Sequence, residues 1–122
     1  MKSVMLACLT LFATAPALAS PPVEVRIDLA SYSIAPKPIH LAAGRPVRLV
    51  ITNRSGAGHD FTARSLFAAA RDVSGPVNKG SVELAGNQSA VVTLTPARGR
   101  YKANCSHFGH SILGMKSLVI VE

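Results

Sequence analysis

The dominant pattern in this 122-residue sequence is a series of short runs in which apolar and polar residues alternate. Residues 23–29 read Val-Glu-Val-Arg-Ile-Asp-Leu, and residues 47–52 alternate in the same way. A period of two is typical of a β-strand with one face in the core and the other in water. Further apolar runs that we expect to be strands cover residues 82–84, 90–95, 100–105 and 117–121, with glycines and prolines between them.

Only one segment has a helical pattern. It runs from Arg64 to Asp72, contains Leu66, Phe67 and three alanines, and is short. The sequence has no repeat, low-complexity tract or linker. About seven short strands with turns between them predict a single all-β domain, an antiparallel β-sandwich or small barrel with one short helix.

The N-terminal residues have the features of a targeting segment. Lys2 precedes an apolar run over residues 4–13, and Pro16 and the small residues Ala17 to Ala19 follow. This order predicts a signal peptide over residues 1–19, cleaved after Ala19 to leave a mature domain of residues 20–122. A membrane anchor is the alternative, but the run is shorter than the roughly 20 residues that span a bilayer. We therefore expect a periplasmic or otherwise exported protein without stable membrane insertion.

Cleavage would leave one cysteine in the mature protein. Cys8 lies in the predicted signal peptide, so Cys105 has no partner for an internal disulfide. An unpaired thiol in an exported protein has three explanations, namely intermolecular pairing, an inert buried side chain, or a metal ligand.

The residues after Cys105 favour the metal ligand. Cys105, His110 and Met115 follow one another at intervals of five in a predicted loop between two strands. Loops at one end of a sandwich cluster together, so His59, which follows another predicted strand, can join them. A thiolate, two imidazoles and a thioether suit copper in both oxidation states. Zinc is the alternative, but structural zinc sites usually have four strong Cys or His donors.

This order of donors resembles the cupredoxin family, which includes plastocyanin, azurin and pseudoazurin. The resemblance implies an eight-stranded Greek-key β-sandwich with one type 1 copper per chain that passes single electrons. Carried over by motif, His59, Cys105 and His110 would be equatorial ligands and Met115 the axial one. The family's usual proline between the cysteine and the second histidine is absent, and Phe108 takes its place.

Asp60 is the residue we expect to support the copper ligands. Its backbone amide is placed to donate to the Cys105 sulfur, and its carboxylate to hold Ser106. The alternative is that Asp60 is a surface turn residue.

Three other side chains raise separate questions. We expect His107 to lie in solvent or beside the ligands, and the alternatives are binding of a second copper or contact with a partner. His40 is expected to be exposed. Phe108 is expected to form part of an apolar rim that passes electrons while excluding water.

The charge balance limits the classes of function. There are 13 basic and 6 acidic residues, a formal net charge of +7 with neutral histidines, which favours a redox partner with an acidic patch or a membrane surface. The basic residues are scattered without aromatic neighbours, which argues against nucleic-acid binding. No enzyme motif is present, so we expect no enzymatic activity.

The sequence is compatible with three functions. The protein is an electron shuttle that keeps its copper, a periplasmic copper carrier or resistance protein that binds and releases copper, or a metal-free secreted sandwich. The oligomeric state is not indicated by the sequence.

Overall fold

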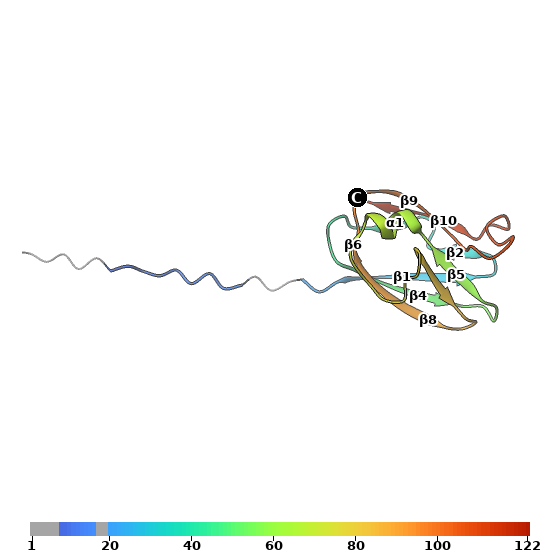
Figure 1. Cartoon of the computed structure of the whole chain (residues 1–122), viewed down its shortest axis with the longest axis horizontal. Helices are drawn as coiled ribbons and strands as arrows, with labels where there is room; N and C mark the ends of the chain where they lie inside the picture. Colours follow the sequence, from blue (N-terminus) through green and yellow to red (C-terminus); the bar gives the residue numbers. More distant parts are fainter. Residues whose placement is uncertain (1–7, 17–19) are drawn as a thin grey trace, which may run out of the picture.

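A computed structural model describes residues 8–16 and 20–122 (Figure 1). Two five-stranded sheets pack against each other. The first contains, in spatial order, β2 (Ser33–Ala35), β1 (Val23–Ala30), β4 (Val47–Asn53), β8 (Ser89–Thr95) and β6 (Arg71–Ser74). The second contains β3 (Ile39–Leu41), β10 (Lys116–Val121), β9 (Gly99–Asn104), β5 (His59–Thr62) and β7 (Ser81–Leu84). The predicted β-sandwich is therefore confirmed, although the described residues form ten strands and not the eight that the family resemblance implies.

Most neighbouring strands in the two sheets are antiparallel. The exceptions are β1 with β4 and β3 with β10, which run parallel. In both parallel pairs, the segment that connects the two strands is long and includes at least one strand of the other sheet, as expected when a chain moves between the layers of a sandwich.

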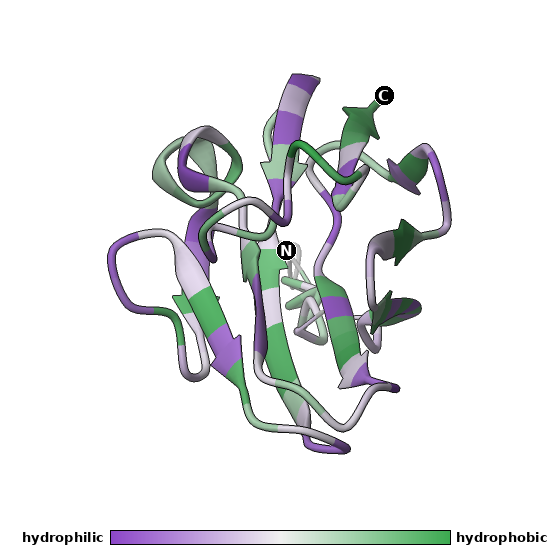
Figure 2. Cartoon of the chain, turned by 90° about the vertical axis from the view of Figure 1, so that its right-hand side faces the viewer, coloured by the Kyte–Doolittle hydropathy of each residue, from purple (hydrophilic) through white to green (hydrophobic). Residues whose placement is uncertain are grey.

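The alternation in the sequence explains the core. Ile27 and Leu29 of β1 and Leu49 and Ile51 of β4 are fully buried, whereas the residues between them, Asp28 and Val50, are only partly buried and face outward. Figure 2 shows this alternation of hydrophobic and hydrophilic residues along the strands. Full burial of one such aliphatic side chain contributes about 1.5–3 kcal/mol to folding, so these positions fix the register of both strands.

The predicted helix is shorter than expected. Helix α1 covers Arg64–Ala69, and its Leu66 and Phe67 pack into the core. The chain becomes extended at Ala70, and Arg71 and Asp72 belong to strand β6 instead. Strands β2, β5 and β6 were not expected, because segments of three or four residues are too short to show a clear period.

The start of β1 and the loop between β9 and β10 lie at opposite ends of the sandwich. The chain enters β1 at the left-hand end of Figure 1, and the loop between β9 and β10 lies at the right-hand end. Residues 8–14 of the predicted signal peptide are exposed and have no regular structure, whereas Lys2 and Ala17 to Ala19 lie outside the described residues. Cleavage after Ala19 stays a prediction. Within the described parts of the chain, no helix is long and apolar enough to cross a membrane.

Candidate metal centre

Cys105 follows the last residue of β9, and its side chain is fully buried. Burial raises the pKa of the thiol, an effect that the Asp60 amide opposes by donating a hydrogen bond to Sγ at 3.5 Å. A thiol with no exposed surface cannot reach a second molecule, which argues against intermolecular pairing. Because a metal binds the thiolate, metal binding must release the thiol proton.

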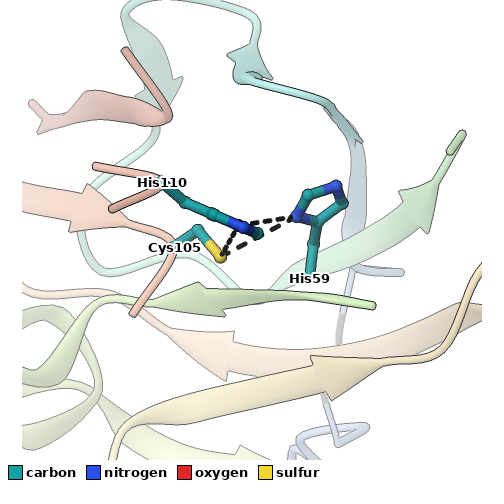
Figure 3. Close-up of side chains that lie close together, drawn as sticks. All are labelled: His59, Cys105 and His110. Carbon is teal, nitrogen blue, oxygen red and sulfur yellow. Dashed lines mark hydrogen bonds between the residues drawn. The ribbon is translucent and has the colours of Figure 1, made fainter. Parts of the chain in front are cut away.

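Two imidazoles meet the sulfur of Cys105. The Nδ1 atoms of His59 and His110 lie 3.2 Å apart, and they are 4.0 Å and 3.5 Å from the sulfur, respectively. Figure 3 shows the three side chains pointing toward one another. Cys105 and His59 are fully buried, and His110 is half-buried. The structure thus brings together three of the four predicted ligands.

The spacing of these donor atoms fits a single transition-metal ion. Bonds of about 2.0 Å to nitrogen and 2.3 Å to sulfur, spread in a triangle, place the donors about 3.5–3.8 Å apart. The observed separations of 3.2, 3.5 and 4.0 Å bracket that range. The donors could therefore bind an ion with small side-chain adjustments.

The loop over residues 105–115 brings the backbone of Met115 next to those of Cys105 and His110. The Met115 amide donates to the His110 carbonyl at 3.1 Å, and the Met115 carbonyl accepts from the Cys105 amide at 3.0 Å. Gly109 and Gly114 have φ values of 76° and 105°, a region that favours glycine, and they allow the loop to turn back. The Met115 side chain is fully buried, and its role as axial ligand stays a prediction.

The turn between β1 and β2 holds the histidines, a role that sequence reasoning missed. The Ser31 hydroxyl lies 2.9 Å from His59 Nε2, so this bond directs Nδ1 of the same ring toward the sulfur. The Tyr32 ring meets the His110 ring edge-on, with centroids 5.0 Å apart. Burial, and then the neighbouring rings of His110 and His107, lowers the pKa of His59 and keeps it neutral, the form that binds metals.

Ser31→Ala should weaken copper binding by about 10- to 100-fold, because the His59 ring loses the bond that orients it. Competition with a copper chelator measures this change. Ser31→Thr keeps the hydroxyl and should restore most of the affinity, and Ser33→Ala, an exposed serine on β2, should have no effect. An affinity of Ser31→Ala within twofold of the unsubstituted protein would show that the hydroxyl does not position the ring.

Both predicted contacts of Asp60 are confirmed. The backbone amide of Asp60 donates a hydrogen bond to the Cys105 sulfur. Its carboxylate accepts hydrogen bonds from the Ser106 amide at 2.9 Å and from the Ser106 hydroxyl. The Thr62 hydroxyl donates a further bond at 2.7 Å. Asp60 is buried, so it is not the surface turn residue of the alternative interpretation. It ties β5 to the loop that carries Cys105.

The remaining singled-out residues lie around the ligands. His107 is half-buried beside them, with its Nε2 2.8 Å from a Glu83 carboxylate oxygen and 3.8 Å from one of Asp60. Glu83, on β7, was not singled out from the sequence. Phe108 is fully exposed, and His40 is exposed, as expected.

Comparison with known proteins places the chain in a family. The family description of the cupredoxin-like domain matches residues 3–120, so the chain belongs to the cupredoxin-like family. No curated protein matches the sequence.

Solved structures agree on the fold. Auracyanin B is 24% identical, with a TM-score of 0.61 over 87% of this chain and 93% of that one. Auracyanin A, described as a "blue" copper protein from Chloroflexus aurantiacus, is 22% identical, with a TM-score of 0.59 over 84% and 100%. A multicopper oxidase from Campylobacter jejuni is 13% identical, with a TM-score of 0.64 over 89% of this chain and 32% of that one.

Family and donor chemistry together identify the cofactor as one copper ion. The donor set of one thiol and two imidazoles, with a buried thioether next in the loop, is the set that copper uses in type 1 sites. The residues that would hold it are His59, Cys105, His110 and Met115.

Proposed function

We propose that this protein is an exported electron shuttle whose copper stays bound while it exchanges single electrons with redox partners. The observation that carries this proposal is the close grouping of the two Nδ1 atoms and the sulfur. A bound copper ion supplies a one-electron couple between Cu(I) and Cu(II). Ligands held by the frame of two sheets need to move little between these states, and this favours fast electron exchange.

The most direct way out for an electron is through His110. Its ring is half-buried, whereas the other two donors have no exposed surface. Phe108, Ile112 and Leu113 of the same loop are exposed, and we call these three apolar side chains the apolar tip. A surface of this kind excludes water when a partner docks. This supports the predicted role of Phe108 as part of an apolar rim.

A copper carrier in the periplasm is the second candidate function. One observation favours it. Asp60 and His107 form a second group of potential ligands with Cys105, and all their donor atoms lie within 4.8 Å of one another. Glu83 adds a carboxylate at the surface of this group. Such a group would offer a path along which copper is passed to an acceptor.

Retention of copper during redox cycling distinguishes the two functions. A shuttle should keep more than about nine-tenths of its copper through repeated reduction by ascorbate and oxidation by hexacyanoferrate(III), with a Cu(I) chelator present throughout. Metal analysis after gel filtration measures the retained copper. Transfer of most of the copper to the chelator in the first cycles would support the carrier.

A further inference from the structure

A basic groove lies beside the metal centre, on the second sheet. It is a cavity of about 550 Å³ whose lining includes Lys37, Lys102 and Lys116, together with Asn104 and Ser111. Neither the copper ligands nor the contacts that support them use the three lysines. A cavity of this size accommodates several side chains of another molecule.

The pairing of β9 with β10 explains why the lysines gather there. Lys116 pairs with Asn104 and Leu118 pairs with Lys102, so these four side chains share the outer face of the sheet. Lys37 comes from the connection between β2 and β3. Because Asn104 directly precedes one ligand and Ser111 directly follows another, the groove begins next to the metal centre.

The charge of the groove is not balanced within the protein. In the part of the chain that the structure describes, none of its three lysines has a carboxylate within 4.0 Å. The carboxylates that do form ion pairs lie elsewhere, on β1 in the other sheet and around His107. The groove is therefore a local positive region that attracts a negatively charged partner.

We propose that the basic groove is the docking site for an acidic segment of the protein with which this protein exchanges electrons. This proposal rests on the proposed function. The adjacent apolar tip supplies the dry contact over His110, and the lysines set the partner's orientation through charge complementarity. The groove is concave and also carries an amide and hydroxyls, which fits carboxylate side chains better than a flat membrane surface.

Binding of a hexaglutamate peptide to the copper-loaded protein tests the proposal. We expect NMR shift changes that are largest at Lys102, Asn104 and Lys116, and binding that weakens as salt screens the charges. The double variant Lys102→Glu/Lys116→Glu should bind the peptide at least about tenfold more weakly. Circular dichroism and the copper absorption check that the variant is folded.

The matched control is Arg45→Glu/Arg98→Glu, which changes the net charge equally with two exposed residues from other loops. It should alter peptide affinity by less than about threefold. Equal loss of binding in both variants would overturn the proposal, because net charge alone would then explain it. Binding of phosphatidylserine vesicles through the groove, without peptide binding, would overturn it in favour of a membrane. Peptide binding needs no redox cycling, so a failure of the shuttle in the chelator test remains a separate result.

Discussion

Replacing Cys105 with serine should abolish the intense visible absorption of the copper-loaded protein and weaken copper binding by at least about 100-fold. The absorption arises from charge transfer between a thiolate and copper, and no other cysteine lies near the two imidazoles. A serine hydroxyl stays protonated at neutral pH and is a harder ligand. Visible spectra and chelator competition measure the two effects.

Two controls separate this loss from damage to the fold. The metal-free Cys105→Ser variant should unfold within about 1 kcal/mol of the metal-free parent, because serine and cysteine are close in size. His40→Ala, at an exposed histidine on β3, should leave both the absorption and the affinity unchanged. Retention of the visible band in Cys105→Ser would contradict the assignment of this thiol as a ligand.

Asp60→Ala should lower the free energy of unfolding of the metal-free protein by about 2–4 kcal/mol. The substitution leaves the amide and the hydroxyl of Ser106 without their acceptor, and the Thr62 hydroxyl keeps only Ser81 as a partner. It also frees the loop that carries Cys105 from β5, so the copper absorption should shift or broaden. Urea unfolding followed by circular dichroism measures the stability.

Asp28→Ala is the matched control for this variant. Asp28 forms an ion pair with Arg54 at 3.1 Å, but both side chains are about half exposed. Exposed pairs of this kind contribute about 0–1 kcal/mol, so the free energy of unfolding should change little. If Asp60→Ala were as mild as Asp28→Ala, the carboxylate would not be what holds the ligand loop.

Features encoded by neighbouring residues could be predicted from the sequence. The longer strands, β1, β4 and β8 to β10, show apolar and polar residues that alternate with a period of two. Cys105, His110 and Met115 lie in one loop, so the sequence itself shows their spacing. His59 was expected in a loop, whereas it begins β5. The prediction still placed it beside the other donors, because both positions lie at the same end of the sandwich.

Contacts between segments that lie far apart in the sequence could not be predicted from it. Ser31 meets His59 across 28 positions, and Glu83 meets His107 across 24. Neither residue belongs to a motif, and serine and glutamate are common on protein surfaces. The same reason applies to the basic groove. Its lysines come from three separate segments, which only the pairing of the strands brings together.

X-ray absorption at the copper edge of the loaded protein determines which atoms bind the metal. We expect one sulfur and two imidazole nitrogens at about 2.0–2.3 Å from copper, with the sulfur signal absent in Cys105→Ser. Copper surrounded only by nitrogen and oxygen, as in a site built from His107 and the carboxylates of Asp60 and Glu83, would contradict the proposed centre.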